Sequence, residues 1–349
     1  MTPQTVAPGP VFARLDRPRS HSPTTLAVIA DPHVALTARG TWKVYHRTLD
    51  RLRTAVAVAN EHADVALVAG DLTRDGHSAE FDAVDDVLGD LDVPWYAVPG
   101  NHDVPKAFDD HTTPPVERFA ERYDPLPFAR EVGELTLLGV DTATSGVAGL
   151  VDGPAVDSDS AAADTRPDQS VAEPATASES RESAADDRRD DLGDLRDTWG
   201  GRVGPAQRAW LGEQLAAADR PVVALHHPAA RLPDCPERGR WRNFSLRDAD
   251  AVSELLRQHD VPLVLSAHHH VPALCTHGDT VEALAPAACS FPQASLHVEV
   301  GPDGATLRLV PLADSAGVAE AHGLARNGSP LGQTVVELVE RRLSARLGD

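Results

Sequence analysis

Cysteine and long apolar runs are scarce in this chain of 349 residues. The three cysteines lie far apart and form no C-x-x-C pair, which argues against a disulfide framework and against a cysteine-ligated zinc site. No run approaches the roughly 18 apolar residues of a membrane helix. Residues 1–20 also lack the apolar stretch of a secretory signal. We therefore expect a cytoplasmic protein with no membrane-spanning segment.

Positive charge is scarce too. The chain has 53 acidic residues against 32 Lys and Arg, for a formal charge of −21, and only two of its bases are lysines, Lys43 and Lys106. Such a surface repels the phosphates of long nucleic acids. An acid-rich, lysine-poor composition is typical of salt-accumulating cytoplasms, where the Debye length shrinks to about 3 Å at molar salt. A GC-rich genome explains little of the acid excess, so we predict a halophilic protein.

Short β-type runs alternate with helical patterns, and several strand-like runs follow one another after residue 280. The predicted strands are residues 26–30, 65–69, 93–98, 135–140, 222–225, 261–265, 281–284, 296–300 and 306–310. The predicted helices are residues 48–62, 78–91, 205–218, 249–259 and 334–347. Ser78 is a plausible N-cap for the second of them. This order predicts an α/β protein whose sheet is mixed rather than wholly parallel.

One segment breaks this pattern. Residues 152–190 carry 11 acids, 4 arginines and only Val156 and Val171 as larger apolar side chains, too few to offset the entropy of ordering. We expect a disordered acidic insertion at residues 152–198, in a surface loop of one domain formed by residues 23–151 and 199–312. Residues 1–22 are expected to be a flexible arm, and residues 313–349 a C-terminal extension with a terminal helix.

Aspartate, asparagine and histidine stand where five of the predicted strands end. The motifs are Asp31-Pro32-His33, Gly70-Asp71, Gly100-Asn101-His102-Asp103, His226-His227-Pro228 and His268-His269-His270. In α/β sheets, sites form where the loops at the carboxyl ends of strands converge. Carboxylate, amide and imidazole ligands without a thiolate suit Mn, Fe or Zn. Each motif alone has a structural explanation in turns or polar patches, but all five in order favour a metal site.

In this order the motifs resemble those of the calcineurin-like metallophosphoesterases, from about residue 26 to residue 310 without the insertion. Within that superfamily the chain looks most like the class III cyclic-nucleotide phosphodiesterases, on residues 141–142, 201–211 and 243–249. The resemblance implies a four-layer α/β/β/α sandwich with two mixed sheets. One residue departs from the pattern, because the family usually has glycine where Ala267 stands. A methyl group there would crowd a backbone with positive φ.

The resemblance also implies two bound metal ions, which we expect to be Mn, Fe or Zn. The residues that would hold the first ion are Asp31, His33, Asp71 and His270. Those that would hold the second are Asp71, Asn101, His226 and His268, with Asp71 bridging the two. His226 is preferred to His227 because the family's ligand is the first histidine before the proline. The histidine triplet also allows a frame that uses His269, but the spacing of His268 and His270 fits the family better.

Two cations predict a mechanism as well. Held about 3.5–4 Å apart, they would clamp the attacking and leaving oxygens, and a bridging hydroxide formed near neutral pH would attack phosphorus in line. Beside Asn101, His102 would face the phosphate and protonate the leaving alkoxide as a general acid. Asp103 would orient that imidazole. Arg247 is either a contact to the phosphate or base of the substrate, or a surface arginine that balances acids.

The function these features favour is a metal-dependent phosphodiesterase acting on small phosphodiesters, with 3′,5′-cyclic nucleotides as the best guess. A broad-specificity phosphomonoesterase or nuclease on the same site is the first alternative. A non-catalytic metal-binding scaffold is an alternative of another class, which the presence of every ligand type disfavours. The expected partner is a small phosphoester substrate, and a homodimer is compatible with the sequence.

Overall fold

The structure of the protein is a computed structural model, and it describes residues 9–105, 113–114, 116–123, 125–143, 200–232 and 244–347. The predicted acidic insertion at residues 152–198 lies outside these ranges, as do residues 1–8 of the predicted arm. Among the described helices, none combines the length and the hydropathy that crossing a bilayer requires.

Six strands form the first sheet, in the order β1-β12-β11-β2-β3-β4. Their bounds are β1 Val11–Leu15, β2 Thr24–Ile29, β3 Val65–Ala69, β4 Trp95–Val98, β11 Ala294–Gly301 and β12 Gly304–Pro311. Strands β2, β3 and β4 run parallel, whereas β11, β12 and β1 are antiparallel to their neighbours. The register pairs Val28 with Leu67 on one side and with Leu296 on the other, so β2 lies inside the sheet.

The second sheet also has six strands, in the order β5-β6-β7-β8-β10-β9. Their bounds are β5 Phe128–Val132, β6 Leu135–Gly139, β7 Pro221–Ala224, β8 Leu263–Ser266, β9 Ala273–His277 and β10 Thr280–Leu284. Strands β6, β7, β8 and β10 are parallel, and the two edge strands are antiparallel. Both sheets are therefore mixed, as the order of the elements predicts.

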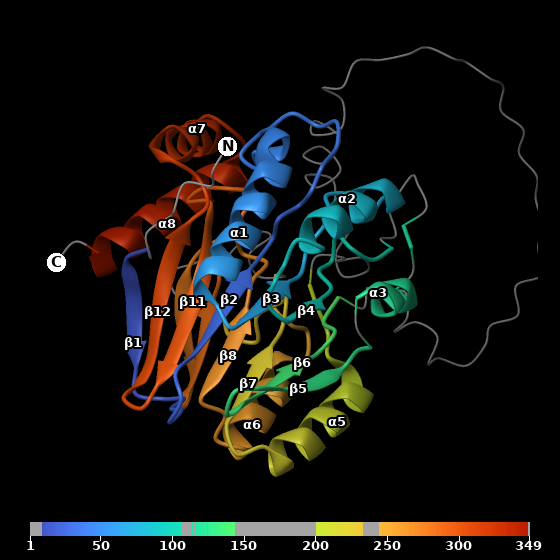
Figure 1. Ribbon diagram of the computed structural model, residues 1–349, viewed down its shortest axis with the longest axis vertical. Coiled ribbons are helices and arrows are strands. Elements are labelled where there is room, and N and C mark those ends of the chain that lie inside the picture. The colour runs from blue at the N-terminus through green and yellow to red at the C-terminus, as the bar shows by residue number, and fades with distance from the viewer. Residues whose placement is uncertain are drawn as a thin grey trace, which may run out of the picture. The chain divides into compact units, whose positions relative to one another are not determined.

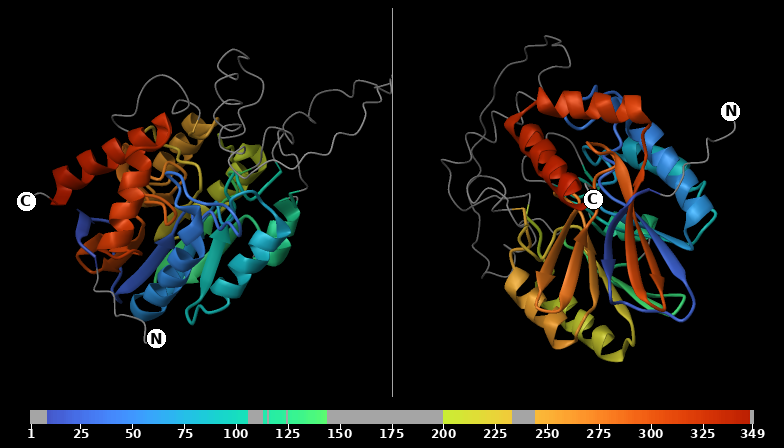
Figure 2. Two further views of the ribbon diagram at one scale, coloured as in Figure 1. Left: turned by 90° about the horizontal axis from the view of Figure 1, so that it is seen from above. Right: turned by 90° about the vertical axis from the view of Figure 1, so that its left-hand side faces the viewer.

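Helices cover the outer faces of the two sheets (Figures 1 and 2). The helices on these faces are α1 Thr48–His62, α2 Ser78–Leu88, α3 Val116–Arg122, α5 Gly204–Ala217 and α6 Ala249–Gln258. Two C-terminal helices, α7 Ser315–Arg326 and α8 Pro330–Leu347, form a separate apolar cluster, and a short 3-10 turn spans Tyr45–Arg47. Apolar side chains of α1 and α2 pack on the first sheet, and those of α5 and α6 pack on the second. The largest apolar cluster lies between the sheets. The predicted α/β/β/α sandwich is confirmed.

The two ends of the chain differ from the prediction. Residues 11–15, expected in a flexible arm, form β1 and pair with β12 at the edge of the first sheet. A second C-terminal helix, α7, precedes the expected one, and its N-cap is Asp314, whose side chain accepts a hydrogen bond from the amide of Gly317. Both C-terminal helices pack against Val44 and Phe291, so their contacts are with the same domain. The N-cap of α2 is His77 rather than Ser78.

Candidate metal centre

Loops after five parallel strands bring the predicted metal-binding residues to one place. The first sheet contributes Asp31 and His33 after β2, Asp71 after β3 and Asn101 after β4, and the second contributes His226 after β7 and His268 and His270 after β8. Six of the seven are buried. The exception, His268, is partly exposed, but both of its ring nitrogens are buried.

The backbone of this region is strained at the positions that carry the side chains. Non-glycine residues rarely have positive φ, yet φ is 47° at Asp31, 44° at His33, 52° at Asp71, 68° at His268 and 57° at His270. Such strain is typical of sites in which a side chain must be held in one direction. Ala267 is not among the described residues with positive φ, so its methyl group causes no backbone conflict. The departure from the family's glycine therefore leaves the loop intact.

Close approach of the chain is needed at one glycine in particular. A Cβ placed on Gly100 would lie 2.1 Å from Oδ1 of Asp71 and 2.2 Å from the Asp71 amide nitrogen. Both distances are far shorter than any non-bonded contact of a Cβ atom in a real structure. Glycine immediately before Asn101 thus lets the loop after β4 pack directly against the carboxylate.

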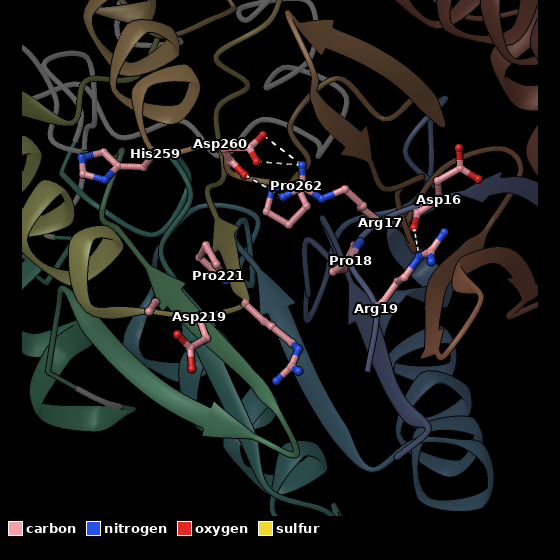
Figure 3. Close-up of a pocket in the computed structure, with 11 residues that line it drawn as sticks. Asp16, Arg17, Pro18, Arg19, Asp219, Pro221, His259, Asp260 and Pro262 are labelled. Atoms are coloured by element: carbon pink, nitrogen blue, oxygen red, sulfur yellow. Dashed lines mark hydrogen bonds and ion pairs between the residues drawn. The ribbon is translucent and has the colours of Figure 1, made fainter. Parts of the chain in front are cut away.

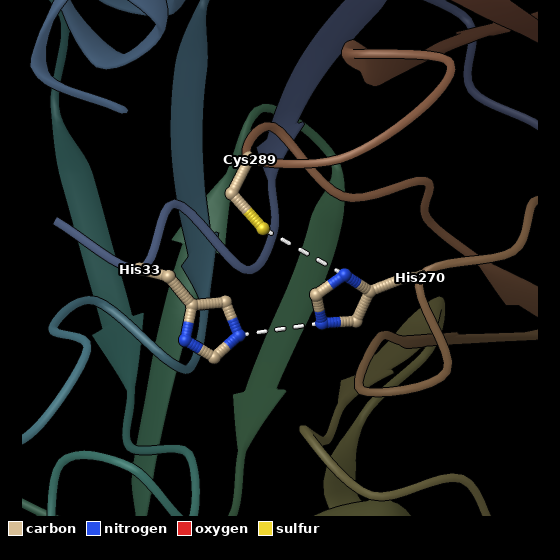
Figure 4. Close-up of side chains that lie close together, drawn as sticks. All are labelled: His33, His270 and Cys289. Carbon is tan, nitrogen blue, oxygen red and sulfur yellow. Dashed lines mark hydrogen bonds between the residues drawn. The ribbon is translucent and has the colours of Figure 1, made fainter. Parts of the chain in front are cut away.

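In the first half of the centre, two imidazole nitrogens and two carboxylate oxygens face one another at 3.3–3.5 Å. Nε2 of His33 lies 3.3 Å from Oδ2 of Asp71. The same nitrogen lies 3.3 Å from Nε2 of His270, as Figure 4 shows. The latter nitrogen is 3.5 Å from Oδ1 of Asp31. Behind it, Nδ1 of His270 lies 2.9 Å from the hydroxyl of Ser290, which orients the ring.

In the second half, the other oxygen of Asp71 faces the second sheet. Its Oδ1 lies 3.4 Å from Nε2 of His226, whose Nδ1 donates to the carbonyl of Ala69 at 2.8 Å. The ring of His268 is 5.0 Å from that of His226, centroid to centroid. Within the described residues, the side-chain amide of Asn101 and both ring nitrogens of His268 have no hydrogen-bond partner.

This donor set fits a pair of metal ions. The His226 ring that donates through Nδ1 presents its Nε2 lone pair to a carboxylate oxygen, an arrangement that needs a proton or a cation between them. Buried polar groups without partners cost free energy, and at Asn101 and His268 a cation would satisfy them. The groups of His and Asp that lie close enough to share an ion include Asp31, Asp71 and His226. The cluster is therefore suited to a dimetal site.

Electrostatics also favours cation binding here. Burial lowers the pKa of His33, His268 and His270 well below the ordinary value, so these imidazoles are neutral at physiological pH. Burial alone would raise the pKa of Asp71, but the neighbouring imidazoles, that of His226 above all, hold it well below its ordinary value. Burial opposes protonation of His226, but the Asp71 carboxylate raises the pKa of that imidazole to about 9, so His226 would release a proton when an ion binds. Neutral imidazoles around an ionised carboxylate are the forms that coordinate metals.

His102 lies beside the centre, but Asp103 does not orient it. The Nδ1 atom of His102 lies 2.5 Å from the carbonyl oxygen of Arg74, and its backbone amide donates to Oδ1 of Asp71 at 2.9 Å. The Asp103 carboxylate instead accepts hydrogen bonds from the amides of Leu72, Thr73 and Gly100. The prediction for Asp103 is therefore wrong: its carboxylate ties the loop after β3 to the loop after β4.

The remaining predicted residues lie at different depths. His227 contacts the hydroxyl of Thr142 through Nδ1 at 2.9 Å, which agrees with a packing role. His269 is buried, and its ring lies 5.9 Å from that of Phe244, centroid to centroid. Arg247 is exposed, and its backbone amide donates to the carbonyl of Gly201. This hydrogen bond fixes the backbone of Arg247, and the substrate role of its side chain stays a prediction.

Two residues in or near the centre, Lys43 and Glu282, lie outside the sequence motifs and were not predicted. Nζ of Lys43 lies 3.3 Å from Nε2 of His33. Glu282, fully buried on β10, accepts hydrogen bonds from the amides of Ala229 and Ala230 and lies 2.8 Å from Nε2 of His277. It thereby fastens the loop that follows His226. Lys43 could have been noticed only as one of two lysines in an acidic chain.

The model of the calcineurin-like phosphoesterase family matches residues 24–272. The chain belongs to the calcineurin-like phosphoesterase family. Membership agrees with the motif order and with the His/Asp cluster between the two sheets, and it makes a metal-dependent phosphoesterase the class of enzyme to consider. Among curated proteins, this phosphoesterase has no match.

Three solved structures are among those to which this chain is similar. A purple acid phosphatase, PPD1, from yellow lupin (Lupinus luteus) seeds is similar with a TM-score of 0.52 and 11% identity, over 85% of this chain and 53% of the lupin chain. A putative 5′-nucleotidase from Staphylococcus aureus has a TM-score of 0.46 and 12% identity, over 92% and 58% of the two chains. The protein TT1561 of Thermus thermophilus has a TM-score of 0.45 and 14% identity, over 84% and 100%. The chain thus spans about half the length of the lupin protein, with which it shares the fold.

Proposed function

We propose that this phosphoesterase is a dimetal phosphodiesterase of small phosphodiesters, with 3′,5′-cyclic nucleotides as its first candidate substrates. The observation that supports the proposal most is the position of the Asp71 carboxylate. Its Oδ2 faces His33 in one half of the centre and its Oδ1 faces His226 in the other, at 3.3 and 3.4 Å. A carboxylate placed in this way can bridge two cations, and such a pair can stabilise both the attacking and the leaving oxygen of an in-line phosphoryl displacement. The net charge of −21 disfavours long nucleic acids as substrates.

The proposed ligands keep the sets that the motifs imply. Asp31, His33, Asp71 and His270 would hold one ion, and Asp71, Asn101, His226 and His268 the other. We propose Mn, Fe or Zn, which suit a set of oxygen and imidazole donors without thiolate. When bound, the two ions supply Lewis-acid stabilisation of the phosphoryl oxygens and lower the pKa of water for attack.

The proposed general acid is His102. Donation from its Nδ1 to the Arg74 carbonyl keeps one proton on that nitrogen, so the imidazolium form of His102 would give its second proton, on Nε2, to the leaving alkoxide and become neutral. The His102 amide hydrogen bond to Asp71 holds this imidazole next to the bridging carboxylate. The ring centroid of His102 is 4.5 Å from that of His33, which places the acid on the first-sheet side.

A substrate panel on one purified sample tests the proposal. The full chain is treated with Mn²⁺ and assayed in low and in molar KCl with 3′,5′-cyclic AMP, bis(p-nitrophenyl) phosphate and p-nitrophenyl phosphate. We expect hydrolysis of both diesters and higher activity at high salt. Hydrolysis of the monoester alone would favour the phosphomonoesterase alternative. No hydrolysis of any ester, with metal bound, would favour the scaffold.

A further inference from the structure

The single lysine that the structure describes reaches the metal centre. Nζ of Lys43 lies 3.3 Å from Nε2 of His33, the same nitrogen that faces Asp71 and His270. The other lysine of the sequence, Lys106, is outside the described residues. In a chain with a net charge of −21, a lysine at this position is not explained by composition.

The backbone around Lys43 is fastened on several sides. Lys43 forms an isolated antiparallel bridge with Ser290, whose hydroxyl orients His270. Its carbonyl accepts a hydrogen bond from the amide of Tyr45 at 2.7 Å, and the adjacent Trp42 packs 5.1 Å from the His270 ring, centroid to centroid. The part of Lys43 that can still change conformation is therefore the four-carbon side chain, which is half-buried and ends beside Nε2 of His33.

The charge of Lys43 acts on both the acidic and the basic groups around it. Burial raises the pKa of Asp31 and lowers that of His270. In both cases the nearby ammonium of Lys43 acts to lower the pKa. A cation held by His33 would repel the ammonium from that nitrogen. The anion that would then be available to an ammonium beside the two ions is the phosphoryl group of a substrate.

We propose that Lys43 binds the non-bridging oxygens of the phosphoryl group and favours dianionic phosphomonoesters over monoanionic phosphodiesters. The inference rests on the proposed function, whose substrate class it refines: without Lys43 the centre would be a more selective diesterase. Coulomb energy is proportional to the charge of the ligand. Removing the ammonium should therefore change the logarithm of the dissociation constant about twice as much for a dianion as for a monoanion.

Three substitutions separate the charge of Lys43 from its shape and from the general field of the loop. Lys43→Met removes the charge and keeps the length of the stem, whereas Lys43→Arg keeps the charge. Arg39→Met removes an exposed positive charge from the same loop and is the matched control. Lys43→Gln serves as a second neutral variant if the methionine variant binds less metal.

The main readout is binding rather than turnover. The Mn²⁺-treated full chain is titrated by calorimetry at about pH 8 with inorganic phosphate, a dianion there, and with dimethyl phosphate, a monoanion. If loss of the charge weakens dimethyl phosphate about fivefold, it should weaken phosphate about 25-fold. Lys43→Arg and Arg39→Met should change either dissociation constant by less than about twofold. The KM values for p-nitrophenyl and bis(p-nitrophenyl) phosphate should follow the same order.

Equal losses for the two anions, or no loss for either, would overturn the inference. An equal loss of anion affinity in Arg39→Met would also overturn it, because the effect would then come from the overall positive charge of the loop and not from Lys43. The proposed function fails separately. A chain that binds phosphate through Lys43 but hydrolyses no ester would contradict the phosphodiesterase and leave the role of Lys43 standing.

Discussion

Polar side chains lie at both the carboxyl ends and the amino ends of the neighbouring strands β7 and β8, but their arrangement differs between the two ends. At the carboxyl end, His226 and His268 are followed by strained or tightly packed loops, and the His268 nitrogens have no partner among the described residues. At the amino end, Pro221 and Pro262 border a hollow of about 580 Å³ (Figure 3). There the charges pair with one another: Arg17 donates to Asp260 at 2.9 Å, at the surface.

The difference shows what distinguishes a binding centre from a charged hollow. Charges that pair at a surface contribute less than about 1 kcal/mol and need no ligand. A buried polar group without a partner costs about 1–3 kcal/mol unless something satisfies it. By this criterion the carboxyl end requires a ligand and the amino end, with its hollow of about 580 Å³, does not.

The largest expected contrast is in activity. Asp71→Asn replaces the bridging carboxylate by an amide, which removes the negative charge between the two halves. We expect kcat/KM for bis(p-nitrophenyl) phosphate to fall on the order of 1,000-fold or more. Asp260→Asn, at the amino end, should leave it unchanged. A similar loss in both variants would show that the two ends do not differ in function.

The second contrast concerns the leaving group. His102→Asn removes the proposed general acid, so kcat for a diester with an alkoxide leaving group should fall about 100-fold. The loss should be much smaller with p-nitrophenolate, which leaves without protonation. His259→Asn, in the hollow at the amino end, is the control. Equal losses for the two leaving groups would rule out proton donation by His102.

The third contrast is in stability. The Glu282 carboxylate accepts hydrogen bonds from the amides of Ala229 and Ala230. Glu282→Gln places an NH₂ group against one of these amides, so one of these two buried hydrogen bonds is lost. We expect the free energy of unfolding to fall by about 2–3 kcal/mol, measured by urea titration at fixed metal concentration. Asp260→Asn, which breaks an exposed pair, should cost less than about 1 kcal/mol. The reverse order would contradict the comparison.

The smallest effect is on the pH dependence of stability. Burial raises the pKa of Glu80 to about 7 from its ordinary value of 4.5. Because the folded state holds this proton more tightly, wild-type stability should decline relative to Glu80→Gln as pH rises from about 4.5 to 7. Glu254, exposed and paired with Arg257, has a lowered pKa, so wild-type stability should not decline relative to Glu254→Gln over this range. Parallel curves for wild type and Glu80→Gln would refute the burial effect.

Much of the fold and the ligand positions could be predicted because they are encoded locally. The runs that form β2, β3 and β8 are short and apolar, and their motifs follow directly in the sequence. Two elements near the two ends of the chain, β1 and α7, could not be predicted in this way. Strand β1 depends on pairing Val11 with Arg308, almost the whole chain away. Helix α7 is rich in alanine and glycine, which gives a weak apolar periodicity.

Roles that depend on contacts between distant loops were the least predictable. Asp103 is adjacent to His102 in sequence, but its partners are the amides of Leu72 and Thr73, about 30 residues earlier. Lys43 reaches His33 from a loop with no recognisable spacing. Glu282 acts on the loop after His226 from another strand. Adjacency in a motif therefore located the centre but did not assign every role within it.

The measurement that tests the central claim most directly is the metal content of the purified chain. Wild-type protein, Asp71→Asn and Asp260→Asn are treated with Mn²⁺, desalted and analysed for metal per chain. The account predicts two ions per chain for wild type and Asp260→Asn and at least one fewer for Asp71→Asn. No retained metal in wild type, or equal content in all three proteins, would contradict a dimetal centre bridged by Asp71.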